Sequence, residues 1–434
     1  MIVPGSSADG PLTPCLNPRL LPKAVVPFFG ARDHYQLPIA LHEQGLLECH
    51  LTDLYFPADR RWFQNTAGKL LSDAAISRRF DPLLPSRQVC IARTMLGPAA
   101  LGIGAGKTRT QRRRDDALGA RAARLAAERG AALFSYSYYA ASAFEAAGDT
   151  VRERFLFQLH PHPASIRQLL TEELERVPQA RESILGETEM ALSADQLARL
   201  SLESTVANGW TVASSFTAET LRASGIPADR IHIVPYGVNH AAFPCRRERP
   251  VSNILRVVFL GSLIQRKGLS YLLDAVRLLN SRQVELTLVG RGNVDRTLLS
   301  HYRDLSVHIK PALNHSQLVS ELHQSDLFVL PSLAEGFGHA ILEAMSTGLP
   351  IVTTRNTCGP DVAQDGVQGF LVPIRNAQAI AEKIEWGLNN RDALAQMGMA
   401  AAARSRHFTW NRFREGARHA YARMFDQLET GAHQ

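Results

Sequence analysis

The chain has 434 residues, of which 45% are hydrophobic and 21% charged, and its formal net charge at pH 7 is +7. This length exceeds what one hydrophobic core of ordinary size supports, so two domains of roughly 200 residues each are expected. The five scattered cysteines form no Cys-x-x-Cys pair and no apolar run reaches the length of a membrane span, which argues against a disulfide framework, a zinc ribbon and a membrane-embedded chain.

Residues 1–22 are rich in Gly, Pro and Ser, which predicts a poorly ordered N-terminus. From residue 23 onward, short apolar runs alternate with helical patterns, as in the helix expected over 38–44. This alternation predicts a doubly wound parallel sheet in a first domain, residues 23–243. Its expected strands are Ala24–Phe29, Leu47–Thr52, Ala131–Tyr136, Phe155–Leu159, Thr211–Phe216 and Ile231–Pro235.

The densest positive charge of the first domain lies in Lys107, Arg109, Arg112, Arg113 and Arg114, ahead of an alanine-rich helical stretch. Two interpretations stay open: a solvated helix entrance, or a contact with phospholipid or an anionic acceptor. No nucleic-acid-binding pattern accompanies the charge, so nucleic acid is not expected as a partner. Because the start of the chain lacks the plan of a signal peptide, we expect a cytoplasmic protein, peripheral at the inner membrane face under the second interpretation.

A polar stretch with Arg and Pro, residues 244–252, is the expected linker, and it precedes a second alternating series in residues 253–408. A last helix is expected over 409–430. The strands of the second domain are expected near 256–261, 285–290, 306–311, 327–331, 350–354 and 369–372. No repeat of solenoid period is present, so the pattern predicts two Rossmann-like domains.

Two acidic residues, Glu335 and Glu343, stand eight positions apart after the apolar run 327–332. The pattern predicts a strand, a glycine loop and a helix. The predicted helix N-terminus consists of Gly336, Phe337, Gly338, His339 and Ala340. Backbone amides at such an end can approach a phosphate, and the helix dipole favours its negative charge. One carboxylate in the loop and one in the helix can then both face a polyhydroxylated ligand.

These motifs resemble retaining GT-B glycosyltransferases, in particular glycosyltransferase family 4, also called glycosyl transferases group 1. The resemblance covers most of the C-terminal half and rests on several segments in the family's order. They are the Glu-x7-Glu spacing, Gly338, Gly348–Val352 downstream, and Val258–Gly268 and Val234–Asn239 upstream. The resemblance implies a GT-B fold, in which two Rossmann-like doubly wound domains face a central cleft, with the last helix crossing back to the first domain.

By this resemblance, Arg266 and Lys267 supply the fixed positive charge for a departing diphosphate, and the glycine loop supplies backbone amides. Glu343 is expected to hydrogen-bond the ribose hydroxyls, and Glu335 to lie close to the donor sugar. Ser262, also expected at the donor, stands where family members often carry Arg. The nucleobase is expected to meet backbone around Lys310–Leu313, which includes Ala312 and Leu313.

The first domain contributes two positions under the same resemblance. Gly30 is expected to let backbone approach the diphosphate, although Ala31–His34 stands where the family commonly has a second glycine. His160 is expected to face the donor sugar, and a satisfied structural histidine is the alternative. No Asp-x-Asp motif exists, and His160 and His162 alternate near a strand end without a third ligand, so no metal is expected.

The resemblance implies a metal-independent retaining hexosyltransferase that uses Glu335, His160, Lys267 and Arg266. Its donor is expected to be a nucleotide diphosphate sugar, UDP- or GDP-linked, which serves as co-substrate without a further cofactor. The hydroxyl acceptor stays open among a glycan, a lipid-linked saccharide and a small metabolite. Two alternatives remain: a nucleotide-sugar epimerase or phosphorylase, and a nucleotide-sugar-binding partner subunit without activity, which Ser262 and the irregular Gly30 loop motivate.

Overall fold

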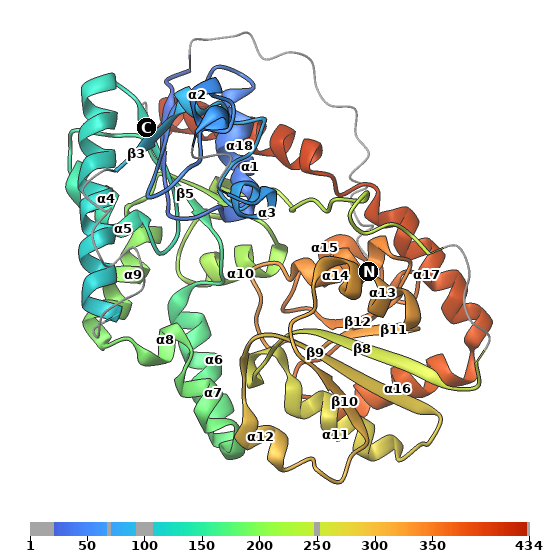
Figure 1. Ribbon diagram of the computed structural model, residues 1–434. Coiled ribbons are helices and arrows are strands. Elements are labelled where there is room, and N and C mark those ends of the chain that lie inside the picture. The colour runs from blue at the N-terminus through green and yellow to red at the C-terminus, as the bar shows by residue number, and fades with distance from the viewer. Residues whose placement is uncertain (1–20, 67–70, 93–106, 247–251, 432–434) are drawn as a thin grey trace.

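Two α/β domains lie side by side in the computed structural model, which describes residues 21–66, 71–92, 107–246 and 252–431 (Figure 1). Each domain has a parallel β-sheet with helices packed on both faces. The expected architecture of two doubly wound domains is therefore confirmed. Two stretches that carried predictions, the start of the chain to residue 20 and the linker segment 247–251, lie outside the described residues.

The first sheet has seven parallel strands in the order β3-β2-β1-β4-β5-β6-β7. Their bounds are β1 Ala24–Pro27, β2 Leu47–Thr52, β3 Val89–Ile91, β4 Ala132–Tyr136, β5 Arg154–Gln158, β6 Gly209–Val212 and β7 Ile231–Ile233. The helices of this domain are α1 Gln36–His42, α2 Arg61–Asn65, α3 Asp73–Ser77, α4 Lys107–Arg129, α5 Ala140–Ala147, α6 Pro163–Arg176, α7 Arg181–Leu185, α8 Thr188–Ala191, α9 Ala194–Val206 and α10 Ser215–Ala223.

The second sheet has six parallel strands in the order β10-β9-β8-β11-β12-β13. Their bounds are β8 Leu255–Leu263, β9 Val284–Val294, β10 Val307–Lys310, β11 Leu327–Leu330, β12 Ile351–Thr354 and β13 Gly369–Val372. The helices are α11 Leu269–Leu279, α12 Arg296–Ser300, α13 His315–Gln324, α14 His339–Ser346, α15 Gly359–Val362, α16 Ala377–Asn389, α17 Arg391–Ser405 and α18 Trp410–Gly431. All six strands expected in this domain are confirmed.

One strand prediction in the first domain was wrong in part. The run expected over 211–216 is extended only as far as Val212, and α10 begins at Ser215. The Ser214 side chain causes the change, because its hydroxyl oxygen accepts the Thr217 amide at 3.2 Å and caps the helix. The short edge strand β3 carries too few residues for its alternation to be recognised.

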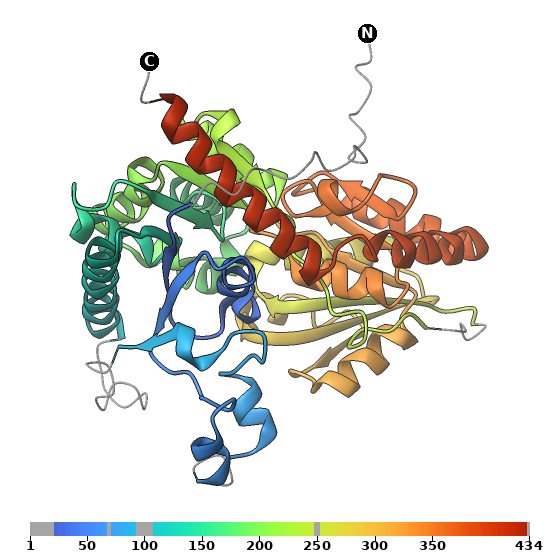
Figure 2. The same cartoon turned by 90° about the horizontal axis from the view of Figure 1, so that it is seen from above.

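Helix α18 leaves the second domain and packs across the first (Figure 2). Its Arg414 donates to the buried Gln36 of α1 at 2.8 Å, and Tyr421 stacks on Phe134 of β4. Tyr421 belongs to a hydrophobic cluster that continues from the first sheet, through Tyr236, into the second domain. This continuous apolar packing joins the two domains.

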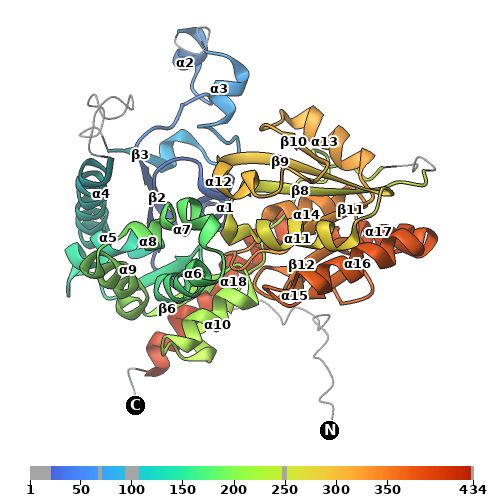
Figure 3. The same ribbon diagram turned by 90° about the horizontal axis from the view of Figure 1, so that it is seen from below.

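The segment that carries α2 and α3 projects away from the rest of the first domain (Figure 3). Close to its base, Arg114 of α4 pairs with Asp53 at 3.6 Å and its guanidinium lies over Phe29. The side chains of Lys107, Arg109 and Arg112 lie outside the described residues, so the interpretation of that basic cluster as a membrane contact stays a prediction. Within the described part of the chain, no helix combines the length and the apolar character that crossing a bilayer requires.

Both strand orders reverse direction beside the first strand, between β1 and β4 and between β8 and β11. In open α/β sheets, the loops at the carboxyl ends of strands beside such a reversal form a crevice. The two crevices of this protein face each other. The candidate site comes from the loops after β1, β8 and β11, beside these reversals, together with the loop after β5.

Candidate functional site

A cavity of about 440 Å³ lies between the domains, at the carboxyl ends of the central strands. The loops after β1 and β5 supply Ala31, Arg32, Asp33, Leu159 and His160. The second domain supplies Gly261, Lys267, Glu335 and Glu343, together with the whole glycine loop from Gly336 to Ala340. Residues that are far apart in the sequence thus meet in one cavity because the two sheets place their loops opposite each other.

Glu335 binds the basic pair directly. Its carboxylate contacts the Lys267 ammonium and lies 3.3 Å from the Arg266 guanidinium, which also donates to the Ala334 carbonyl at 2.8 Å. On its other side, Arg266 pairs with Glu187 of the first domain at 3.0 Å. The structure therefore brings Lys267 into the cavity, whereas Arg266 lines a neighbouring one.

The charges of this cluster oppose the effect of burial on one another's pKa. Burial works to raise the pKa of Glu335, but Lys267 and Arg266 outweigh it, and the pKa of this carboxyl lies below its ordinary value. Burial lowers the pKa of Lys267, and Glu335 opposes that shift. The ion pairs with Glu335 thus hold the Lys267 side chain at the wall of this cavity and Arg266 beside it.

The glycine loop presents the N-terminus of α14 to the cavity. Gly338 is the N-cap residue of this helix and has a φ of 91°, a left-handed conformation that glycine adopts without strain. His339 and Ala340 open the helix, where backbone amides have no intrahelical carbonyl partner. His339 stacks on Tyr236 with ring centroids 4.7 Å apart. Tyr236 lies in the segment after β7 that leads to the second domain, residues 234–246, which we call the hinge, so this contact holds the helix start against the hinge. The wall at this point suits an anion.

Gly336 is where the two domains approach most tightly in the glycine loop. A Cβ added at this position would lie 1.8 Å from the Leu159 carbonyl oxygen. The Gly336 carbonyl accepts hydrogen bonds from Ser214 at 2.6 Å and from Thr217 at 3.1 Å, both of the first domain. Only a glycine fits this contact, which positions Glu335 next to the end of β5.

His160 faces the cavity from the loop after β5. Its side chain is reached by solvent, but the walls of both domains surround it. This surrounding protein, with the nearby Arg266 and Arg32, lowers the pKa of His160 to about 4. The ring packs edge-on against Tyr138 with centroids 5.4 Å apart. Neutral at ordinary pH, His160 can exchange hydrogen bonds with a sugar without adding charge.

The loop after β1 reaches the cavity through residues that follow Gly30. The Gly30 amide donates to Asp53 at 3.2 Å, and Gly30 is not among the lining residues. Asp33, His34 and Tyr35 instead take left-handed conformations without being glycine, an arrangement that stores strain. The Tyr236 hydroxyl donates to Asp33 at 2.8 Å and holds this loop from the hinge. Sequence reasoning missed the roles of Asp33 and Tyr236.

Glu343 lies half-buried on α14, in the wall of the cavity. Ser262, on β8 beside Gly261, is not among the lining residues. A separate cavity of about 590 Å³ opens past the ends of β8 and β9 and is lined by Gly290, Lys310 and Ala312. Leu313 is not among its lining residues. Within the described part of the chain, no group of three or more His, Cys, Asp or Glu side chains could hold a metal.

The second domain has recognisable relatives. Residues 247–404 match the sequence pattern of the family described as "Glycosyl transferases group 1". These residues belong to that family. The glycosyl transferases group 1 domain thus includes the basic pair, both glutamates and the glycine loop, as the resemblance drawn from the sequence implied.

Curated relatives match part of the chain. The amylovoran biosynthesis glycosyltransferase AmsK of Erwinia amylovora is 30% identical over 176 residues, which are 37% of this chain and 42% of that protein. A D-inositol 3-phosphate glycosyltransferase of Pseudarthrobacter chlorophenolicus is 30% identical over 266 residues, 57% of this chain and 60% of that protein. The chain thus spans about half the length of the curated relatives that it matches.

Solved structures share the fold along nearly the whole chain. Sucrose-phosphate synthase from Thermosynechococcus elongatus has a TM-score of 0.61 at 18% identity, covering 93% of this chain and 100% of that one. HepE of Anabaena, solved in complex with UDP-glucose, has a TM-score of 0.58 at 16% identity, covering 94% and 100%. These likenesses show that the glycosyl transferases group 1 domain and its partner domain together form the GT-B fold.

Proposed function

We propose that this protein is a retaining glycosyltransferase, which moves a hexosyl unit from a nucleotide diphosphate sugar to a hydroxyl acceptor in polysaccharide or glycoconjugate biosynthesis. One observation carries the proposal: Lys267, Glu335 and the N-terminus of α14 converge on a single cavity between the domains. The relatives named as glycosyltransferases and the neighbour solved with UDP-glucose support the same class of reaction.

The diphosphate of the donor would lie between Lys267 and the amides of His339 and Ala340. The Glu335 carboxylate is the counter-ion of Lys267 and Arg266. A diphosphate at the helix N-terminus would share these cations and gain the helix dipole. Because the cations and amides are already in place, they stabilise the departing charge without reorganising.

The remaining parts of the donor follow from the positions around the diphosphate. Glu343, on α14, would accept a hydrogen bond from each of the two ribose hydroxyls, one on each carboxylate oxygen. The nucleobase would enter the separate cavity of about 590 Å³ that Lys310 and Ala312 line. The hexose would lie between Glu335 and His160, and the neutral imidazole would bind a sugar hydroxyl.

The proposed displacement keeps the anomeric configuration. The acceptor hydroxyl attacks the anomeric carbon on the face from which the diphosphate leaves. One carbon–oxygen bond forms as the other breaks, and the hydroxyl proton passes to a departing phosphate oxygen. No step needs a metal, because Lys267 and Arg266 provide the positive charge that the leaving group requires. Closure of the domains would exclude water and limit hydrolysis of the donor.

The test begins with thermal melting in the presence of UDP, GDP, ADP and TDP and their sugar conjugates, because a ligand that binds only the folded protein raises the melting temperature. Sugar transfer from the selected donor is then measured against a panel of hydroxyl acceptors. Lys267→Ala and Glu335→Ala are expected to abolish transfer while the variants still fold, whereas the surface variant Lys23→Ala retains it.

Three outcomes would contradict the proposal. Undiminished transfer by Lys267→Ala and Glu335→Ala would remove the cavity from the mechanism. Epimerised donor without an acceptor, or transfer to free phosphate, would indicate an epimerase or a phosphorylase. Donor binding without consumption across the panel would indicate a binding subunit.

A further inference from the structure

A second cavity, of about 260 Å³, adjoins the proposed donor cavity and shares Arg32, Leu159 and His160 with it. Its other walls come from the loop after β4, from α6, from α8 with the residue that precedes it, and from Arg266 of the second domain. His160 is thus common to both cavities. If the donor hexose lies against His160, as proposed above, this second cavity gives an attacking hydroxyl access to it.

A buried carboxylate is fixed in its wall. Glu189 of α8 is 5% exposed, and its carboxylate accepts a hydrogen bond from the Tyr138 hydroxyl. Burial and the adjacent Glu189 raise the pKa of Tyr138, so this hydroxyl keeps its proton. The Tyr138 amide in turn donates to the buried Glu203 at 2.7 Å, which holds the loop. A carboxylate can accept about four hydrogen bonds, so Glu189 has capacity for ligand hydroxyls.

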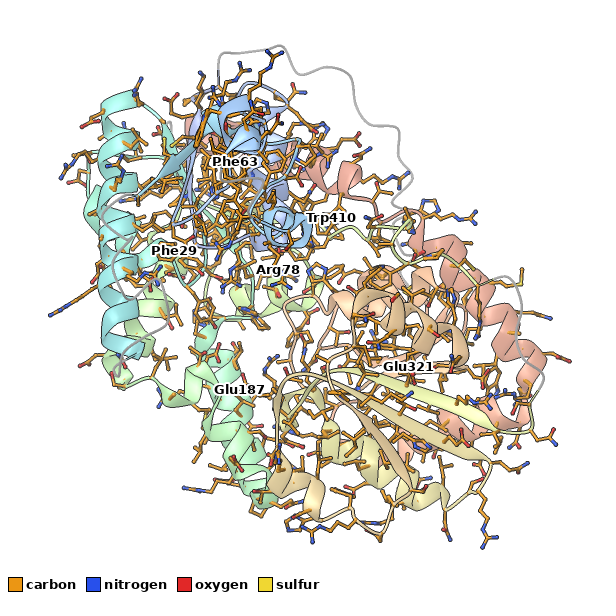
Figure 4. All side chains as sticks on the ribbon, in the orientation of Figure 1. Phe29, Phe63, Arg78, Glu187, Glu321 and Trp410 are labelled. Atoms are coloured by element: carbon orange, nitrogen blue, oxygen red, sulfur yellow. The ribbon has the colours of Figure 1, made fainter. Side chains whose placement is uncertain are left out.

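A second carboxylate lines the same cavity from the start of α8. Glu187, labelled in Figure 4, lies where the first domain meets the second. It pairs with Arg266 of the second domain at 3.0 Å, and its side chain is only 14% exposed. Two carboxylates therefore face one small cavity, and both are held by partners on other elements.

The balance of charge in this cavity decides which ligand fits. Its lining contains two anions, Glu187 and Glu189, and two cations, Arg32 and Arg266. Arg266 is already bound by Glu187 and Glu335. A donor diphosphate nearby would be a further anion that interacts with the Arg266 guanidinium. With the donor bound, the surroundings of the acceptor would be net negative, and a further anion would be repelled.

We propose that this second cavity binds an uncharged, polyhydroxylated acceptor, such as a neutral sugar ring, and rejects acceptors that carry a phosphate or carboxylate beside the reacting hydroxyl. The inference rests on the proposed function, because it names the acceptor class of the same site. Hydroxyls of the ring donate hydrogen bonds to the carboxylates of Glu189 and Glu187. A ring held in this way directs another of its hydroxyls toward His160 and the donor.

The experiment compares neutral sugars with their phosphate esters. Transfer is measured from the selected donor, UDP-glucose or GDP-mannose, to glucose, mannose and myo-inositol and to the corresponding monophosphates. A neutral acceptor is expected to have the higher kcat/KM. Glu189→Gln is expected to raise the KM of the neutral acceptor about tenfold, since a hydrogen bond to a charged group is weakened, and to leave UDP or GDP affinity unchanged.

Glu187→Gln provides a second and opposite readout. By freeing Arg266, it is expected to raise the kcat/KM of the phosphate ester relative to that of the neutral sugar. Glu175→Gln, on the exposed side of α6 and outside the cavity, makes the same change of charge and is the matched control. Should Glu189→Gln fail to fold, Tyr138→Phe removes only the hydroxyl that positions Glu189 and is expected to raise the same KM.

The results separate the two proposals. Absence of both donor hydrolysis and transfer would overturn the proposed function, and the acceptor inference with it. Donor turnover with preference for a phosphate ester, or with no transfer to any neutral sugar, would overturn the acceptor inference alone. An unchanged acceptor KM in both Glu189→Gln and Tyr138→Phe would also overturn it.

Discussion

Replacing Gly336 by alanine should separate the two domains at the glycine loop. The added Cβ would lie 1.8 Å from the Leu159 carbonyl oxygen, whereas Cβ atoms in proteins essentially never approach within 3.0 Å, so the backbones must part by more than 1 Å. Such overpacking costs about 1–3 kcal/mol. A displacement of that size beside reacting groups can lower a rate about a hundredfold.

The assay measures kcat/KM for sugar transfer, nucleotide affinity by calorimetry, and thermal melting. We expect Gly336→Ala to lower kcat/KM about a hundredfold, to lower the melting temperature by a few degrees, and to change nucleotide affinity little, because most proposed nucleotide contacts lie within the second domain. Gly366→Ala is the control for a loss of stability alone: its φ of 79° strains an alanine, but no atom beyond its chain neighbours lies within 4 Å of the added Cβ, so sugar transfer is expected to be retained. Full transfer activity in Gly336→Ala would refute the reasoning.

Three further predictions concern single side chains. Glu173→Gln should lower the free energy of unfolding by about 2 kcal/mol, because the buried Glu173 binds Gln265, Tyr271 and Arg375 of the second domain. Urea unfolding of this variant and of the exposed Glu172→Gln tests it, and an equal loss of unfolding free energy in both variants would contradict it. Glu343→Gln should weaken UDP or GDP binding about tenfold, and unchanged calorimetric affinity would exclude the ribose contact. Burial lowers the pKa of His50 to about 4, so His50 is protonated near pH 6.5 in the unfolded chain but stays neutral in the folded chain until about pH 4. The free energy of unfolding should therefore fall by up to about 3 kcal/mol between pH 6.5 and pH 4. A His50→Leu variant with the same pH dependence of unfolding would disprove this.

The candidate site was only partly predictable from the sequence. Glu335, Lys267 and the glycine loop were found because they follow buried strands at a spacing that a family shares. Ala31, Arg32 and Asp33 line the cavity instead of the expected Gly30, because the Gly30 amide is directed to Asp53. Their left-handed stretch without glycine gave no local signal of its conformation.

The sequence by itself determined the two doubly wound domains and the basic and acidic residues after β8 and β11. These properties are local, since a buried strand shows its apolar run and a phosphate-type loop its glycines within a few residues. Only the tertiary structure decided which residues face them from the other domain: Glu187 on Arg266, the Leu159 carbonyl on Gly336 and Glu173 on Gln265. Such contacts join positions about 80 or more apart in the chain, and they depend on how two packed bodies meet, which no periodicity along the sequence encodes.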